Sequence, residues 1–161
     1  MYRMEIKMQY LINIIMAFLG GAGFSLLYNI RRSKLLITSF GSAIGWTVYT
    51  LLKLFVTDSD IFGFFAAAVV VTIYAEIFAR IKKTPTTTYL VVGIIPMIPG
   101  SSLYYTMNYA FKGDWESFSS MGLYTLQLSM SLAVGIIVVS SVMTMTNAIL
   151  NKIKSANAYK K

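Results

Sequence analysis

The sequence predicts an all-α integral membrane protein with about five transmembrane helices, the fourth of them broken at a motif of prolines and glycines. Of the 161 residues, 57% are hydrophobic and only 12% are charged, and the charges fall in clusters separated by long uncharged runs. Crossing ~30 Å of hydrocarbon takes ~20 apolar helical residues, which most of these runs supply. Pro96 and Pro99 lie inside the fourth run and predict its break. We expect a single membrane domain over residues 1–161.

The composition also narrows the chemistry. The chain has no cysteine, so a disulfide framework, a thiol nucleophile and a thiolate metal site are excluded. It has no histidine, the commonest proton shuttle and metal ligand. No carboxylate pair falls within a predicted span, so we expect no enzyme, no metal and no cofactor. A net charge of +8 would suggest nucleic acid on a soluble protein, but here we attribute it to basic cytoplasmic loops and expect a lipid bilayer instead.

The first predicted span covers residues 8–30. It follows Arg3 and Lys7, as the apolar part of a signal peptide would, but the run is too long and lacks a small-x-small cleavage site. We therefore interpret it as a retained helix. Asn29 is predicted to cap its C-terminus, with substrate contact as the alternative.

The second and third predicted spans cover residues 35–56 and 61–79. The second contains "GSAIG", a small-residue spacing that favours close helix packing. In the third, Glu76 is the only acid inside an apolar run, which makes it a candidate for proton coupling. Arg80 lies four residues later, so an ion pair along the helix is the alternative.

The loop between these two spans carries Asp58 and Asp60. We interpret both as residues of a solvated outer turn. Lys53, near the end of the second span, is expected to reach the same side of the membrane.

The fourth predicted span, residues 86–111, is the one that we expect to be broken. Pro96 removes the N–H that would bond to the carbonyl of Val92, and Pro99 does the same for Ile95. Unpaired backbone groups cost several kcal/mol in lipid, so such a joint is buried in protein or lines a wet cavity. Broken helices at mid-membrane point to a transport site. A purely structural kink is the alternative.

The second half of this span begins with Gly100-Ser101-Ser102. Serine is a good helix N-cap, and the free N–H groups of a helix start carry partial positive charge that can hold a carboxylate. A tyrosine and an asparagine follow within the same half-helix. The predicted substrate-binding set is Pro96, Pro99, Gly100, Ser101, Ser102, Tyr105 and Asn108.

The fifth predicted span covers residues 118–149, and the loop charges then give an orientation. With five crossings, one side of the membrane holds ten basic residues: Arg31, Arg32, Lys34, Arg80, Lys82, Lys83, Lys152, Lys154, Lys160 and Lys161. The positive-inside rule places that side, with the C-terminus, in the cytoplasm and the N-terminus outside. A re-entrant hairpin in place of the fourth crossing would nearly abolish this bias, so we prefer a full crossing.

Two stretches resemble the threonine/serine exporter family. "GIIPMIPGSSLYYTM", residues 93–107, is similar to the family signature, and "GAGFSLLYNI", residues 21–30, to its first-span motif. One departure is that Arg31 and Arg32 follow Asn29, where the family pattern has a proline. The length matches the short membrane subunit of the family's two-component form.

The resemblance implies export of threonine, serine or small dicarboxylates across the cytoplasmic membrane, driven by the proton-motive force. It also implies a larger membrane subunit as partner. From the residues alone, a substrate-binding membrane component of an ATPase-dependent vitamin importer and a membrane assembly protein without substrate remain alternatives. Whether the chain works alone, as a homo-oligomer or in a heteromer is left open, as are its substrate and coupling ion.

Overall fold

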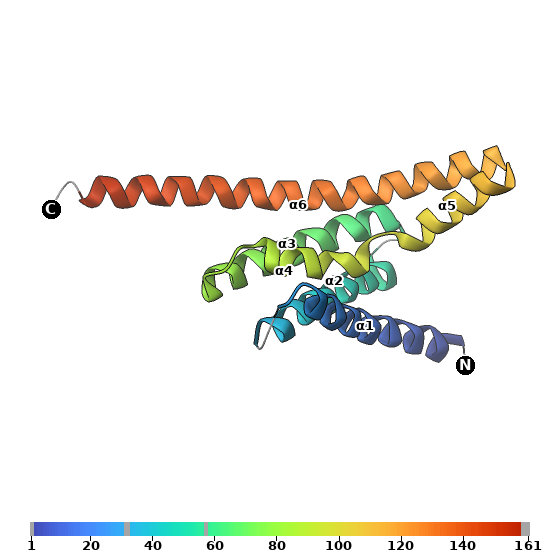
Figure 1. Cartoon of the computed structure of the whole chain (residues 1–161), viewed down its shortest axis with the longest axis horizontal. Coiled ribbons are helices and arrows are strands. Elements are labelled where there is room, and N and C mark those ends of the chain that lie inside the picture. The colour runs from blue at the N-terminus through green and yellow to red at the C-terminus, as the bar shows by residue number, and fades with distance from the viewer. Residues whose placement is uncertain (1, 31–32, 57, 159–161) are drawn as a thin grey trace.

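The protein is built from long helices that run side by side, with the two termini at opposite ends of the molecule (Figure 1). The computed structural model describes residues 2–30, 33–56 and 58–158, so Arg31, Arg32, Lys160 and Lys161 of the predicted basic side lie outside it. The elements in chain order are α1 (Tyr2–Leu27), α2 (Ser33–Phe55), α3 (Asp60–Lys82), α4 (Thr87–Ile94), the short 3₁₀ helix η1 (Ile95–Met97), α5 (Gly100–Lys112) and α6 (Trp115–Ala158).

The described residues contain four helices long and apolar enough to cross a membrane, namely those with apolar stretches at Met8–Leu27, Lys34–Phe55, Asp60–Lys82 and Trp115–Ile149. A fifth crossing forms if Thr87–Met97 and Gly100–Lys112 are taken together. This pair is bent by 53° at the intervening break. The prediction of an all-α membrane protein with about five spans and a broken fourth span is confirmed.

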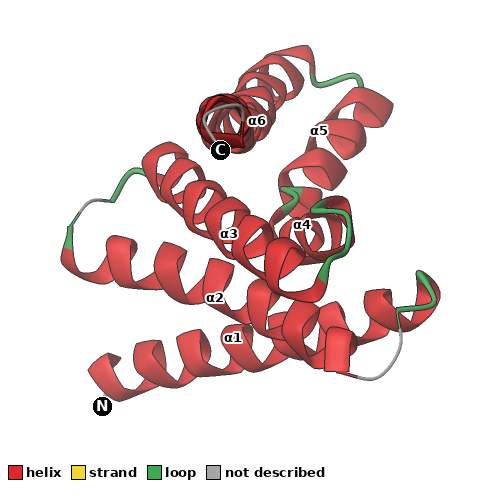
Figure 2. Ribbon diagram, turned by 90° about the vertical axis from the view of Figure 1, so that its left-hand side faces the viewer, coloured by secondary structure: helices red, strands yellow, loops and turns green. Residues whose placement is uncertain are grey.

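The helices pack in a chain of neighbours, α1 on α2, α2 on α3 and α3 on α6, while α4 lies against both α2 and α3 (Figure 2). Helix α5 leaves this arrangement and packs on α6. The broken span therefore has one half in the centre of the molecule and the other half at its side.

Close packing in the centre depends on glycine. A Cβ added to Gly45 would lie 2.8 Å from the sulfur of Met97, and one added to Gly93 would lie 2.8 Å from Cγ1 of Val71. Real Cβ atoms do not approach so closely, so these glycines allow α2, α3 and α4 to meet around Val71, which is fully buried. The packing interpretation of "GSAIG" is confirmed.

Helix α1 ends as its sequence predicts. Asn29 has a φ of 57°, in the left-handed region that asparagine tolerates better than most residues. The N–H of Ile30 then donates to the carbonyl of Ser25 at 2.8 Å, which is the wrapped hydrogen bond of a Schellman C-cap. The cap turns the chain towards α2.

The last helix is longer than predicted. It has 44 residues, which at ~1.5 Å per residue gives a length of ~66 Å, and its C-terminal part projects beyond the other helices (Figure 1). It starts after Asp114, whose carboxylate accepts the N–H of Ser117 at 3.1 Å. Hydrogen bonds from the Ser117 side chain and backbone lower the pKa of Asp114. Beyond residue 149 no proline or glycine stops the helix, so it continues to Ala158.

Candidate functional site

The break in the fourth span is a short irregular joint between two helices. Helix α4 passes into η1, Ile98 is extended with φ −59° and ψ 129°, and Pro99 precedes the first turn of α5. The residue before a proline avoids the helical conformation because the proline ring collides with it, which explains the geometry of Ile98. The N–H of Ile98 donates to the carbonyl of Ile95 at 3.1 Å, so that carbonyl does not remain unpaired.

Two side chains of α2 donate hydrogen bonds to two further carbonyls at the joint. The hydroxyl of Ser42 donates to the carbonyl of Val92 at 3.0 Å, and the indole N–H of Trp46 donates to the carbonyl of Pro96 at 3.1 Å. Ser42 and Trp46 lie one helical turn apart, so both face the joint. Protein groups of α2 therefore satisfy the carbonyls of Val92 and Pro96, as expected for a joint held within the protein, although Ile98 and Gly100 are exposed.

A cavity of about 270 Å³ adjoins the joint, and we call it the break cavity. It is lined by Asn13, Met16 and Ala17 of α1, together with Trp46 and Pro96. Asn13 also accepts a hydrogen bond from the Gln9 amide at 3.3 Å. The break cavity therefore combines an apolar wall with an amide, but it has no charged group among its lining residues.

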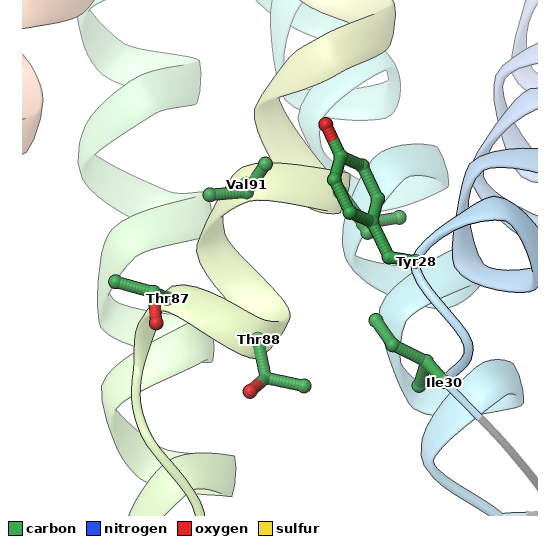
Figure 3. A pocket seen from close by; sticks show the side chains of 6 residues that line it. Tyr28, Ile30, Thr87, Thr88 and Val91 are labelled. Atoms are coloured by element: carbon green, nitrogen blue, oxygen red, sulfur yellow. The ribbon is translucent and has the colours of Figure 1, made fainter.

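A second cavity, of about 290 Å³, lies between helix α4 and the residues that follow α1, and we call it the inner cavity. Figure 3 shows Tyr28 and Ile30 at the end of α1 facing Thr87, Thr88 and Val91 of α4. Val92 also lines it, and the carbonyl of Val92 is the one that Ser42 holds. Only this cavity includes residues of α4, since the break cavity is lined by α1, α2 and η1.

The predicted site residues of α5 lie away from these cavities. Pro99 occupies the N-cap position of α5, and no side chain caps the helix there. Ser101 and Ser102 are instead inside the first turn, with Ser101 exposed and Ser102 partly buried. The expectation that a serine caps this helix is therefore wrong, because the N-cap position falls on Pro99, two residues before Ser101.

The rest of the predicted set is spread around the break. Pro96 lines the break cavity, Pro99 is buried, and Gly100 is exposed with open space around it. Tyr105 is 49% exposed and its ring lies against Tyr104. Asn108 is partly buried. The structure thus brings Pro96 into a cavity and leaves the start of α5 on an open face.

Glu76 lies at the end of α3 that carries the basic residues. Its carboxylate is 3.8 Å from the guanidinium of Arg80 and accepts a hydrogen bond from the hydroxyl of Thr86 at 3.2 Å. Its side chain is 16% exposed. The alternative of an ion pair along the helix is confirmed, while a role in proton coupling stays a prediction.

The structure also shows a cluster that the sequence interpretation missed. Asp60 accepts hydrogen bonds from the Tyr49 hydroxyl, the Lys53 ammonium and the Tyr124 hydroxyl, each at 2.6 Å. The interpretation of Asp60 as a solvated turn residue is wrong, whereas Asp58 is exposed as expected. Opposite charges at the facing ends of two consecutive spans were a usable signal for the Lys53–Asp60 pair. Tyr124, 64 residues further along, gave none.

These features define a class of protein first. Several apolar helices long enough to span a bilayer, one of them broken at prolines beside a cavity, are the features of a multi-pass membrane protein of the transporter type. Comparison with known families then matches residues 13–142 to the family described as Threonine/Serine exporter, ThrE, and the chain belongs to that family. The family is one of transporters rather than enzymes. No curated protein and no solved structure matches the chain.

Proposed function

We propose that the protein is the short membrane subunit of a two-component secondary transporter that exports threonine and serine across the cytoplasmic membrane, driven by the proton-motive force. The observation that carries the proposal is the broken span of a family member, with its joint sealed by α2 and its proline facing a cavity. A purely structural kink would need the hydrogen bonds from α2, but it would not need a cavity beside the proline.

The chemistry of the start of α5 fits the carboxylate of an amino acid. Helix α5 has no side-chain cap. The N–H of Gly100 already donates to the carbonyl of Ile98, so the N–H groups of Ser101 and Ser102 are the ones that could bind an anion. Ser101 and Ser102 would add hydroxyl groups within the same turn. A carboxylate at a helix start is stabilised by ~0.5–2 kcal/mol. Tyr105 and Asn108 lie on the next turns of the same helix.

The exposure of the start of α5 supports a second subunit. Ser101 and Tyr105 are exposed in this chain, and among the described helices α5 packs mainly on α6. A cargo that contacts both the break cavity and α5 would be enclosed only if another protein covers this face. The larger membrane subunit of the two-component form would do so.

The proposed orientation places the basic end in the cytoplasm. Arg80, Lys82 and Lys83 follow one another at the end of α3 and are exposed, and Lys152 is exposed on the last helix. The opposite end carries Asp58, Asp114 and Glu116. Under the positive-inside rule the C-terminus is then cytoplasmic and the inner cavity opens towards the cytoplasm.

An efflux assay tests the function. Cells fed dipeptides of threonine or serine are followed for release of the free amino acid, with this chain expressed alone and with the membrane protein encoded beside it. We expect release to rise when both proteins are present. A parallel arm with succinate tests small dicarboxylates as cargo. If neither cargo leaves faster than from cells with an empty vector, the proposed export function is refuted.

The site is tested in the same assay by the double variant Ser101→Ala, Ser102→Ala. We expect lower export with unchanged amounts of protein in the membrane, because neither hydroxyl group makes a hydrogen bond that holds the described residues together. The matched control is Ser120→Ala, an exposed serine on α6. If the double variant exports at the wild-type rate, Ser101 and Ser102 do not take part in cargo binding.

A further inference from the structure

A single carboxylate ties three helices together at the end of the molecule opposite the basic residues. Asp60 is the first residue of α3, and its Oδ1 accepts from both Tyr49 and Lys53 of α2. Its Oδ2 accepts from Tyr124 of α6. We call these four side chains the outer clasp.

The contacts of the outer clasp are short hydrogen bonds to a carboxylate. Hydrogen bonds to an ionised group are shorter and stronger than neutral ones, and all three donors lie at 2.6 Å. The side chains of Lys53 and Asp60 are only 35% and 23% exposed, so solvent screens their attraction less than on an open surface. Asp60 also sits at the positive end of the α3 dipole.

The outer clasp is physically connected to the helix break. The ring of Tyr49 meets the ring of Trp46 edge to face, with centroids 5.4 Å apart, and Trp46 donates to the carbonyl of Pro96. Gly63 makes room for this arrangement, since a Cβ there would lie 2.8 Å from the Tyr49 ring. Asp60, Tyr49, Trp46 and Pro96 therefore form a continuous series of contacts.

The same clasp holds the two halves of the broken span in their relative positions. Helices α5 and α6 are joined by a short turn at Gly113 and by a hydrogen bond between the hydroxyls of Thr106 and Thr125 at 3.3 Å. Any movement of the outer part of α6 away from α3 would therefore carry α5 with it. Such a movement would change the angle between the two halves of the broken span at Pro99.

We propose that the outer clasp is the outer gate of the transporter, and that cargo leaves only when Tyr124 separates from Asp60. The proposal rests on the proposed export function and on the proposed orientation. With the clasp closed, α6 is held to α3, and the two halves of the broken span keep their relative positions. Loss of one hydrogen bond to a charged group shifts the opening equilibrium by about tenfold or more towards the open form.

Thr50 provides a reporter position for this movement. It shares a face of α2 with Trp46 and Lys53, is 4% exposed, and its hydroxyl has no hydrogen-bond partner among the described residues. Thr50→Cys therefore removes no hydrogen bond that the described residues make. Because the natural chain has no cysteine, the new thiol is the only one in the protein.

The experiment measures how fast a membrane-impermeant maleimide labels Thr50→Cys in intact cells that also contain the partner subunit. We expect slow labelling in the otherwise natural chain and labelling about tenfold faster with Asp60→Asn or with Tyr124→Phe, which removes a single hydroxyl. The matched controls are Asp58→Asn, an exposed acid two residues away, and Tyr104→Phe, an exposed tyrosine. Both should leave the rate unchanged.

Unchanged labelling in both Asp60→Asn and Tyr124→Phe, with each protein present in the membrane at natural amounts, would overturn the gate. Equal acceleration by Asp58→Asn would overturn it as well. The export assay on the same cells separates the two proposals. If labelling rises as expected but even the natural chain exports no amino acid, the gate stands and the export function fails; if export is normal and labelling never changes, the gate alone fails.

Discussion

At the scale of single residues, the hydroxyl of Ser42 determines whether the helix break can stay buried. Pro96 cannot donate an N–H to the carbonyl of Val92, and Ser42 supplies the replacement at 3.0 Å. Val92 is 1% exposed, so water is a poor substitute for that donor. One side chain thus makes a proline tolerable in a part of the protein where unpaired backbone groups are costly.

Ser42→Ala should therefore destabilise the protein by ~1–3 kcal/mol, the cost of leaving a buried acceptor without its partner. The matched control is Ser39→Ala. Ser39 is equally buried, but its hydroxyl bonds to the carbonyl of Leu35 within its own helix, where a backbone N–H already serves that acceptor. Thermal unfolding in detergent compares the two. Equal stability of both variants would contradict the role assigned to Ser42.

Glu76 poses a different question at the residue scale, because its contacts are structural and its proposed role is functional. Glu76→Gln can keep the hydrogen bond from Thr86 but cannot ionise. If Glu76 carries the coupling proton, the pH dependence of export should flatten in this variant. Export measured from pH 5 to 8 checks this, with Asp58→Asn as the control. A profile identical to that of the natural chain leaves Glu76 as the partner of Arg80.

The residue scale is also where sequence interpretation reached its limit. The sequence predicts which carbonyls lose their helical donor at a proline, because each lies only four residues before the proline. The groups that satisfy them, Ser42 and Trp46, lie 50 residues away from their acceptors, and nothing in the sequence pairs them. The same limit explains why Tyr124 was not associated with Asp60.

At the scale of elements, the broken span combines a buried half with an exposed half. Helix α4 and η1 lie against α2 and α3, whereas α5 lies against α6. The two prolines, the long uncharged run and the glycines predict the break, its place and the total length of the span. They do not predict the direction in which α5 turns, because that depends on the tertiary contact between Thr106 and Thr125.

Pro96→Ala should give position 96 a backbone N–H that can donate to the carbonyl of Val92, and this should straighten the joint. A proline inside a helix costs ~3 kcal/mol, so we expect the variant to be as stable as the natural chain or up to ~3 kcal/mol more stable. Export should fall strongly, because a straighter span moves α5 relative to the break cavity. Thermal unfolding and the efflux assay measure the two effects. The control is Pro85→Ala, an exposed proline outside the helices. Normal export by a stabilised Pro96→Ala would show that the break serves packing only.

At the scale of the whole molecule, the charge distribution predicts the orientation of the protein in the membrane. The exposed basic residues at the end of α3 and on α6 lie at one end, and the acidic residues of the opposite loops lie at the other. This asymmetry was readable from the sequence, since it needs only the order of the spans. The length of the last helix was underestimated, because the prediction ended the helix with its apolar run at residue 149, whereas no proline or glycine follows to stop it before Ala158.

Single cysteines test the orientation in a chain that has none of its own. Asp58→Cys should be labelled in intact cells by a membrane-impermeant maleimide, and Lys82→Cys only after the membrane is permeabilised. Both positions are exposed, so burial does not confuse the comparison. The opposite labelling pattern would invert the topology and, with it, the assignment of the inner cavity and the outer clasp to their sides of the membrane.

The central claim is that cargo binds at the break, between Pro96 and the first turn of α5, and protection of Ser102→Cys tests it most directly. Ser102 is partly buried in that turn, and a thiol there is close to the natural hydroxyl in size. In membranes that contain both subunits, free threonine at twice its dissociation constant should slow alkylation of this thiol about threefold, while Ser120→Cys on α6 reacts at an unchanged rate. If threonine is exported by the same preparation and yet leaves the alkylation of Ser102→Cys unaltered, cargo does not bind at the break.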